Sequence, residues 1–516
     1  MPLGMWSRGI RMLGIAFWVA ATASDVTIAR EAATPAATET PPAIAATSES
    51  DAWELAPVLL YGREVPDSPG RKVLETGRLY AVDSATFVVW ARVEETAKAW
   101  VLLGVRNARI ETIGVEKSEE ADRTGSKDRV LAIRRQEPGQ GSRLGASVVA
   151  GQGLVYLQEK SFGDFPSGER NPIFCWDGRG LRKLLGPGDE ISFRGVTYRC
   201  AGATLGNANA SGTVLIAFTT SQPAKGFGLA LHDAKGLRPI LAEDQPVPGR
   251  PDARFRASTL SCGRTNVEEA VLADDGAVVL SVHMSDKAGT RRGIYAVTED
   301  ETRQLVAAGD PCPDEEGSKV RACDFKVVEA RAGAQVVASF SCGRLKGRLW
   351  DGERWAVVDA GSLTVEQAVL LAPGSSWVFW KGSSVREEKR SGETVTLSAE
   401  GWGLFDGARS RDLRANGNNP TGFELVPGGG DFSGVVLQYG WGVLGLEDRF
   451  LDARAPGKGL QPVPRFKTLQ GPSVPLSDVL TWTGGHSALV AIRRATGNDD
   501  RIGAGIYLMT MKQEAP

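Results

Sequence analysis

Histidine and cysteine are scarce in this chain. Of its 516 residues, only 3 are histidine and 6 are cysteine. The histidines lie far apart in the sequence, and the widely spaced cysteines include no Cys-x-x-Cys pair. These spacings argue against a zinc site and against a histidine-based catalytic triad. We therefore expect no resident metal and no cofactor.

The chain also lacks an excess of charge of one sign. It has 60 Lys and Arg residues and 62 Asp and Glu residues, which gives a formal net charge of −2. Nucleic-acid partners require a basic surface, so we exclude them. No apolar run reaches the roughly 20 residues of a membrane-spanning helix. No stretch keeps the apolar spacing of a helix over three turns either. We expect an all-β chain without a membrane span in its mature form.

The N-terminal residues have the pattern of a secretory signal. Arg8 and Arg11 precede an apolar stretch at 12–21, and Ala21-Thr22-Ala23 fits the rule for cleavage after small residues. We predict a signal peptide at 1–23, a disordered Ala/Thr/Pro-rich linker at 24–52 and a single folded domain at 53–516. An uncleaved N-terminal anchor is the alternative. Export would place the protein in the periplasm, on the cell surface or outside the cell.

In an exported protein, cysteines favour disulfides. Cys312 and Cys323 flank one short polar loop, so we predict that they pair with each other. The other four cysteines allow three arrangements, of which we favour Cys262–Cys342 with Cys175–Cys200.

A repeating unit can be read in full from Val267 to Pro313. Its β-rich runs at 270–273, 277–282, 293–297 and 303–306 are separated by turns that contain Gly, Asp or Pro. Four short strands in succession form a meander, which is the blade of a β-propeller.

The second run of this unit recurs eight times, and an Asp-Gly pair recurs between the third and fourth runs of three units. Asp-Gly suits a two-residue hairpin because Gly adopts positive φ readily. The second runs begin at 87, 154, 214, 278, 336, 377, 435 and 488. We predict a propeller of eight four-stranded blades. If one copy is not a true blade, there are seven. The first copy is ambiguous, because its fourth strand is either 110–115 or 130–133.

The last unit lacks its fourth strand near the C-terminus. The third run at 293–296 is matched by Gly505-Ile506-Tyr507-Leu508 near the C-terminus. The sequence of the fourth run, which should follow it, is found instead at 56–66. A first strand that completes the last repeat closes a ring. We therefore predict that an N-terminal strand closes the propeller.

These units, with Gly-x-Val-Val, Gly-Ile-Tyr and Leu-Val-x-x-Gly-Asp-Pro-x-Pro in succession, resemble those of uncharacterised exported β-propeller-repeat proteins of bacteria. The resemblance covers roughly residues 53–516 and implies fold and export. Its motifs mark blades, so it implies no catalytic residue.

Binding in propellers usually involves the loops at one end of the central channel that join each outer strand to the next inner strand and second strands to third strands. The first strand of each blade lines that channel. Several first runs here carry carboxylates, which could bind a cation or a basic group, or act as a general acid and base. The simpler alternative is that they face water or pair with Arg199, Arg264, Lys326 and Arg331. The candidates are Glu268, Glu269, Glu329, Glu366, Glu424 and Asp478.

Tryptophans offer a second kind of site, because indole rings stack on sugars. They also fill the space between blades, which we expect for most of them. Trp441, between two glycines in an expected loop, is the channel-facing candidate.

No G-x-S-x-G, P-loop, H-E-x-x-H or EF-hand motif occurs in the sequence. We therefore favour an exported, non-enzymatic binding or scaffold propeller whose ligand is a protein or a glycan. The alternatives are a carbohydrate-active hydrolase or lyase that uses channel carboxylates, and a structural ring in a larger assembly.

Overall fold

The computed structural model describes most of the chain between residues 53 and 511. The described residues are 53–65, 68–94, 99–107, 109–115, 131–132, 148–151, 153–159, 172–223, 226–256, 270–321, 325–331, 335–371, 376–390, 393–414, 419–429, 432–439, 448–469, 473–476, 479–484, 487–492 and 504–511. They belong to one compact unit, Ser50–Pro516. Among them, no helix combines the length and the apolar character needed to cross a membrane.

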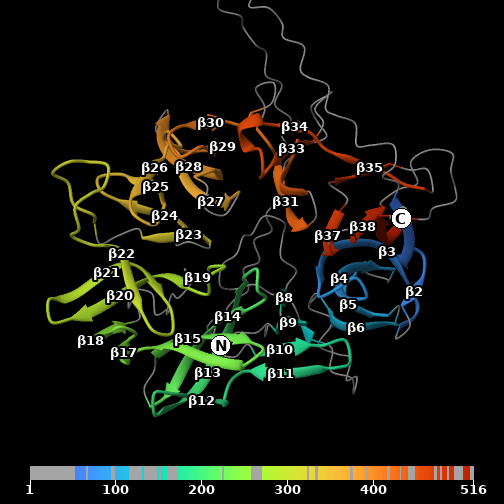
Figure 1. Cartoon of the computed structure of the whole chain (residues 1–516), viewed down its shortest axis with the longest axis horizontal. Coiled ribbons are helices and arrows are strands. Elements are labelled where there is room, and N and C mark those ends of the chain that lie inside the picture. The colour runs from blue at the N-terminus through green and yellow to red at the C-terminus, as the bar shows by residue number, and fades with distance from the viewer. Residues whose placement is uncertain are drawn as a thin grey trace, which may run out of the picture. The chain divides into compact units, whose positions relative to one another are not determined.

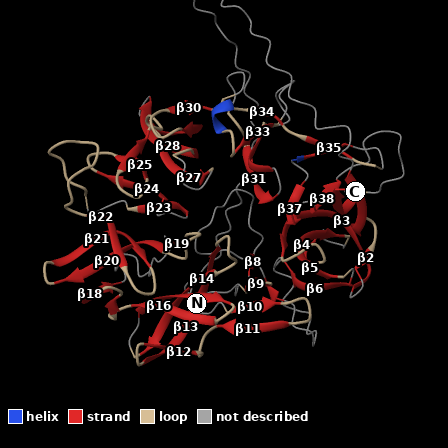
Figure 2. Ribbon diagram, in the orientation of Figure 1, coloured by secondary structure: helices blue, strands red, loops and turns tan. Residues whose placement is uncertain are grey.

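The unit contains eight blades of four antiparallel strands each, and in seven of them the four strands follow one another along the chain (Figures 1 and 2). Blade 1 contains β3 (Ser68–Ala81), β4 (Thr86–Val93), β5 (Ala99–Arg106) and β6 (Arg109–Val115). Blade 2 contains β8 (Val148–Gly151), β9 (Leu154–Gln158), β10 (Ile173–Trp176) and β11 (Leu181–Leu185). Blade 3 contains β13 (Val196–Ala208), β14 (Val214–Gln222), β15 (Gly226–Asp233) and β16 (Gly236–Ala242). Blade 4 contains β19 (Ala270–Leu272), β20 (Val278–Asp286), β21 (Gly289–Val297) and β22 (Thr302–Ala307).

The second half of the chain continues the pattern. Blade 5 contains β23 (Lys326–Arg331), β24 (Gln335–Ser341), β25 (Leu345–Trp350) and β26 (Trp355–Val358). Blade 6 contains β27 (Thr364–Leu370), β28 (Val378–Arg390), β29 (Glu393–Phe405) and β30 (Ser410–Asp412). Blade 7 contains β31 (Gly422–Gly429), β32 (Phe432–Gln438), β33 (Arg449–Asp452) and β34 (Gln461–Pro462). Blade 8 contains β37 (Val479–Gly484), β38 (Ser487–Ile492), β39 (Gly505–Met511) and β1 (Trp53–Leu60).

Blade 8 confirms the predicted closure of the ring. β1 lies antiparallel to β39, with Trp53 opposite Met511 and Leu60 opposite Gly505. The strand order is β1-β39-β38-β37, so the N-terminal strand is the outer strand of the last blade. The chain is an eight-bladed β-propeller, as predicted.

The first strands of successive blades contact one another and are therefore innermost. The contacting pairs are β3 with β8, β8 with β13, β13 with β19, β19 with β23, β23 with β27, β31 with β37 and β37 with β3. Blades 6 and 7 meet through a shared cluster that includes Phe379, Trp402, Phe423 and Val435.

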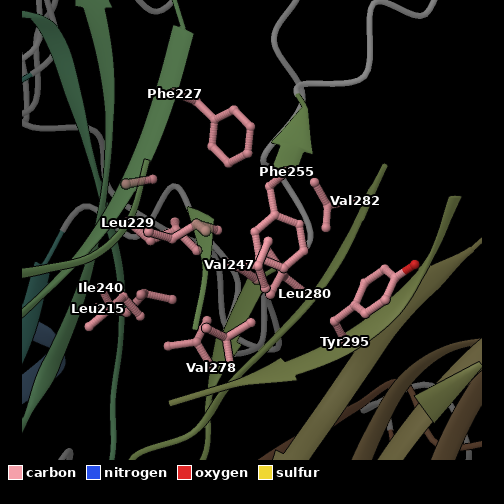
Figure 3. Close-up of a cluster of buried hydrophobic side chains, with 14 of the residues drawn as sticks. Leu215, Phe227, Leu229, Ile240, Val247, Phe255, Val278, Leu280, Val282 and Tyr295 are labelled. Carbon is pink, nitrogen blue, oxygen red and sulfur yellow. The ribbon is translucent and has the colours of Figure 1, made fainter. Parts of the chain in front are cut away.

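The hydrophobic core is divided into eight clusters, one between each pair of neighbouring blades. Figure 3 shows the cluster between blades 3 and 4, where side chains of both sheets fill the space between them. Alternation along a strand sends its side chains to opposite sides: Val278 and Leu280 of β20 belong to this cluster, whereas Val279 belongs to the next. Trp380 and Trp402 are buried in such clusters, as expected of blade packing.

Short additional strands extend several blades. β7 runs parallel to β6 in blade 1, so both segments proposed for its fourth strand join the sheet, with 109–115 in the regular position. β2 (Glu64–Val65) pairs with β3, and β12 (Glu190–Phe193) pairs with β13, so each lies beside the first strand of a blade. β17 (Pro246–Val247) pairs with β18 (Arg250–Arg256), and β18 pairs with β20, the second strand of blade 4. β35 (Arg465–Lys467) and β36 (Ser473–Pro475) form a separate hairpin. β7 (Leu131–Ala132) and the 3-10 turn η2 (Pro456–Lys458) are the remaining described elements.

The Asp-Gly pairs form the predicted turns between third and fourth strands. Gly178, Gly352 and Gly407 have φ of 80°, 107° and 93°, which favours glycine. Asp351 Oδ1 accepts hydrogen bonds from the backbone N–H groups of Glu353 and Arg354 at 3.0 and 2.9 Å. These bonds hold the pKa of the Asp351 carboxyl below its usual value.

The disulfide differs from the predicted pairing, because Cys312 is bonded to Cys342, with their Cα atoms 5.9 Å apart. The predicted pairs Cys312–Cys323 and Cys262–Cys342 are therefore wrong; Cys262 and Cys323 lie outside the described residues. The reason is the path of the loop after β22. The Arg321 N–H donates to Ser341 O at 2.8 Å, and this contact brings the loop alongside the end of β24, where Cys342 follows.

The predicted pair Cys175–Cys200 is also wrong, because both cysteines are buried and free. Cys175 lies on β10 of blade 2, and its Sγ donates to Arg182 O at 3.7 Å. Cys200 lies on β13 of blade 3, and its Sγ donates to Gly202 O at 3.2 Å. Each thiol thus has its own carbonyl acceptor.

A buried amide joins blades 2 and 3. Gln158 is 2% exposed, and its Nε2 donates to Ala203 O at 2.7 Å while its Oε1 accepts from the Leu205 N–H at 2.9 Å. The side chain therefore pairs with the inner strand of the next blade as a backbone segment would.

We expect Gln158→Met to lower the free energy of unfolding by about 2–4 kcal/mol, because it leaves a buried N–H and a buried carbonyl without partners. Urea titration of both proteins measures the change. Gln438→Met is the matched control, because Gln438 is exposed. Equal losses for the two variants would contradict a role of Gln158 in joining the blades.

Candidate functional site

A polar cavity of about 310 Å³ lies between blades 3 and 4. Its walls are the β13–β14, β19–β20 and β21–β22 turns, together with residues of β15 and β16. In an antiparallel meander these first-to-second and third-to-fourth connections lie on the same edge of the ring. This edge is opposite the one on which we expected binding loops.

Acids and hydroxyls dominate the lining. Four carboxylates face one guanidinium, with three hydroxyl groups between them, so the cavity carries an excess of negative charge. The lining residues are Asn209, Ser211, Thr213, Leu231, Arg238, Ile240, Asp274, Asp275, Gly276, Thr298, Glu299 and Asp300.

Hydrogen bonds hold the turns of the two blades together. Asn209 Nδ2 donates to Ala273 O at 3.2 Å, and the Ala210 N–H donates to Asp274 Oδ1 at 2.9 Å. Asn209 Oδ1 also accepts from the N–H of Thr213 at 3.0 Å. Hydrogen bonds therefore fix the β13–β14 and β19–β20 turns that bound the cavity relative to each other.

The ion pairs leave part of the negative charge uncompensated. Arg238 pairs with both Asp233 and Glu299. Burial acts to raise the pKa of Asp233, but the hydrogen bonds from Arg238 and from the Lys235 N–H outweigh it, and the pKa lies below its usual value. Asp274 Oδ2 is 3.7 Å from Arg331 Nε. Asp300 has no ion-pair partner among the described residues.

A second cavity, also of about 310 Å³, lies at the same edge between blades 5 and 6. Its lining contains one acid, Asp351, and one base, Arg354, which pair with each other at 3.4 Å. The acid-rich lining is therefore a property of the first cavity and not of the repeat.

Two of the six candidate carboxylates have described side chains, and both are half-buried. Glu329 lies on β23, and its Oε1 accepts from the Ala330 N–H at 3.2 Å. Glu366 lies on β27 and accepts from the Ser383 hydroxyl. For Glu424 the structure describes only the backbone, opposite Val436 in β31. Glu268, Glu269, Asp478 and Trp441 lie outside the described residues, so a channel site composed of these residues stays a prediction.

Glu329 and Glu366 occupy different positions of the repeat, because each of their strands contains a bulge and only Glu366 lies at the bulged position. In β23 the register skips Val328, between Val327 and Glu329. In β27 it skips Glu366, between Val365 and Gln367. Glu366 therefore corresponds to Val328, and Glu329 corresponds to Gln367. A bulge changes the direction of the side chain and of those after it, so these two acids are not equivalent members of one set.

Tyr156 and His232 form a buried hydrogen bond between blades 2 and 3, with Tyr156 Oη 2.8 Å from His232 Nδ1. Burial raises the pKa of Tyr156 well above its usual value, so the hydroxyl keeps its proton. Burial also lowers the pKa of His232; the charge of Arg182 adds to this effect and Asp233 opposes it. His232 is therefore neutral near pH 7, and in its hydrogen bond with Tyr156 either Nδ1 or the hydroxyl can be the donor, depending on the imidazole tautomer.

We expect the free energy of unfolding to fall as the pH drops below about 6.5, because unfolded histidine then binds a proton that folded His232 resists. His283 contributes in the same direction, since burial and Arg292 lower its pKa. Urea titrations between about pH 8 and about pH 5 measure the slope. His232→Gln should reduce it and a His232→Gln/His283→Gln variant should reduce it further, whereas an unchanged slope in both would refute this assignment.

The chain matches no family model and no curated protein. It is similar in structure to the β-propeller domain of the Trilobed protease from Pyrococcus furiosus, at 8% identity over 73% of this chain and 95% of that one, with a TM-score of 0.35. The Pyrococcus horikoshii acylaminoacyl peptidase is 12% identical over 84% of this chain and 59% of that one, with a TM-score of 0.34. A polysaccharide lyase, the PL25 ulvan lyase, is 10% identical over 75% and 91%, with a TM-score of 0.31. Likeness this distant carries no information on activity.

The acid-lined cavity was not anticipated from the sequence. Asp274-Asp275-Gly276 read as a turn after a first strand, and residues 298–301 read as a turn before a fourth strand. The available signal was that both kinds of turn lie on one edge of a propeller, so that acids in them come together. The carboxylates that the sequence singles out belong to the first runs of the units and not to these turns.

Proposed function

We propose that this chain is an exported, non-enzymatic binding propeller, and that the cavity between blades 3 and 4 binds a positively charged group of a protein or glycan ligand. The acid-rich lining, held in place by hydrogen bonds between two blades, carries the proposal. An ammonium or guanidinium group would find carboxylate and hydroxyl acceptors there. The disulfide fits an oxidising compartment, which supports export.

The carboxylates support binding better than acid–base catalysis. A general acid that works near neutral pH needs a raised pKa. Among the described carboxyl groups with a shifted pKa, the shift is downward in each case: Asp177, Asp233, Asp314, Asp351 and Asp406. None of these five carboxyl groups therefore has the raised pKa of a general acid, and one of them, Asp233, pairs with Arg238 in the wall of the cavity.

The test is binding to lysine-rich and arginine-rich oligopeptides and to partly deacetylated chitosan oligosaccharides, measured by calorimetry at two salt concentrations. We expect a variant with Asp274→Asn, Asp275→Asn and Asp300→Asn to bind about tenfold more weakly, since each exposed charge contributes roughly 0.2–1 kcal/mol. Binding of the wild type should also weaken with salt.

The control replaces three acids away from the cavity, Glu54, Asp252 and Asp359, with the corresponding amides. It keeps the same net charge as the triple variant, so it separates a local effect from a general one. If both variants lose the same affinity, or if only the acetylated sugars bind, the cavity is not the cation site. Turnover of any probe would refute the non-enzymatic assignment.

A further inference from the structure

Charged side chains surround the Cys312–Cys342 disulfide on the edge opposite the acid-lined cavity. Cys312 follows β22 of blade 4, and Cys342 follows β24 of blade 5. The two sulfur atoms and a carboxylate oxygen of Asp314 all lie within 4.8 Å of one another. Cys312 is 9% and Cys342 6% exposed, and they lie beneath a loop whose residues Pro311, Pro313 and Glu315 are exposed.

Arg348 is held in one position beside this disulfide. Its side chain, on β25, is 0% exposed. Its Nε and Nη2 donate to Asp314 Oδ1 at 2.9 and 2.6 Å, and its Nη1 donates to Phe340 O at 2.6 Å. The guanidinium also lies over the ring of Phe340, 4.2 Å from its centroid. A guanidinium keeps its charge when buried, so a fixed positive charge stands next to the bond.

The two sulfurs have neighbours of opposite charge. Nη2 of Arg348 lies 3.5 Å from Cys342 Sγ. Asp314 Oδ1 lies 3.2 Å from Cys312 Sγ. Burial acts to raise the pKa of Asp314, but the hydrogen bonds from Arg348 and Lys346 outweigh it and the pKa is lowered, so this oxygen is anionic. A thiolate would be stabilised at Cys342 and destabilised at Cys312.

This difference determines which sulfur can leave in thiol–disulfide exchange. Exchange proceeds when a thiolate attacks one sulfur and expels the other as a thiolate, and a leaving group of lower pKa leaves faster. Attack at Cys312 places the departing charge on Cys342, beside the guanidinium. Attack at Cys342 would place it on Cys312, beside the carboxylate.

We propose that Cys312–Cys342 is a thiol-exchange site, at which an external low-molecular-weight thiol forms a mixed disulfide with Cys312 and releases Cys342 as a thiolate held by Arg348. The first step forms the bond between the external sulfur and Cys312 and breaks the bond to Cys342. A second external thiolate then attacks the external sulfur of the mixed disulfide. Cys312 leaves, takes up a proton and donates it in a hydrogen bond to Asp314. Two external thiols are thereby oxidised to their disulfide, and the protein disulfide is reduced to a dithiol.

The first test needs no variant. The folded full-length protein is mixed with reduced glutathione near neutral pH and quenched with acid at intervals; remaining thiols are alkylated and the adduct is located by mass spectrometry. We expect glutathione on Cys312 in at least about tenfold excess over Cys342. Adducts mainly on Cys342, or equally on both, would overturn the proposal. So would exchange only when the protein unfolds, which would make the disulfide a structural cross-link only.

Two variants test the cause of the preference. Asp314→Asn removes the negative charge beside Cys312 and should shift adducts toward Cys342. Lys346→Met is the matched control: Lys346 Nζ also pairs with Asp314, at 3.0 Å, but neither cysteine is among its described contacts. It should leave the adduct ratio within about twofold of wild type. If Asp314→Asn does not fold, the pH dependence of Cys342 alkylation in the reduced wild type decides, because a Cys342 pKa at or above that of an ordinary thiol would refute the role of Arg348.

Discussion

Deleting residues 53–60 is expected to abolish the folded ring. β1 is the outer strand of blade 8, and three of its side chains, Trp53, Leu55 and Leu59, are 5%, 6% and 0% exposed. Burial of three such side chains contributes about 5–9 kcal/mol, which approaches the roughly 5–15 kcal/mol total stability of a protein. Without β1, the edge of β39 would also lose its hydrogen-bond partners.

Circular dichroism melting and size-exclusion chromatography measure this loss. The control replaces Glu54 and Ala56, which are exposed on the same strand, with serine; it should melt within a few degrees of wild type. A synthetic peptide of residues 53–60 added to the deletion variant should restore part of the folded signal. A deletion variant that melts like the control would refute closure by β1.

Replacing Asp314 with alanine is expected to lower the free energy of unfolding by about 3–5 kcal/mol, the usual result of leaving a buried charge without its partner. Arg348 has no exposed side-chain surface, and Asp314 is the acid that pairs with it. The wild type should also lose this contribution in acid, as the pH falls through the lowered pKa of Asp314.

Asp406→Ala is the comparison, because Asp406 caps an exposed turn through the N–H groups of Ala408 and Arg409; we expect a loss of about 1 kcal/mol or less. An Asp314→Leu/Arg348→Met variant should recover most of the stability, since apolar pairs replace buried ion pairs well. Urea titrations compare the four proteins. If Asp314→Ala is no less stable than Asp406→Ala, the buried charge is not balanced mainly by Asp314.

The blades could be predicted because each depends on short-range pattern. Alternating β-branched residues and Asp-Gly turns determine strands and hairpins locally, and all eight second strands lie where the sequence indicated. Closure of the ring could be predicted as well, because the N-terminal strand has the sequence pattern of the fourth run of a repeat. The fourth strand of blade 1 was ambiguous, since two segments had the right composition and both join the sheet.

The candidate site and the disulfide depend on structural details that the pattern of apolar and turn residues in the sequence does not contain. A bulge such as the one at Val328 adds one residue to a strand and reverses the side-chain alternation beyond it, so acids counted along first strands cannot be assigned to a face. The disulfide depended on the path of the loop after β22, and proximity in sequence suggested Cys323 instead of Cys342. The acid-lined cavity depends on turns of two blades and is visible only once the ring is assembled.

The pairing of β1 with β39 constrains the order in which this protein can fold during its synthesis. Trp53 is synthesised long before its partner Met511 in β39. Until then β1 carries apolar side chains and an unpaired strand edge, the kind of segment that joins wrong partners. Closure of the ring therefore has to wait until β39 has been made, and we expect a chaperone that shields residues 53–60 during that delay to raise the yield of folded protein.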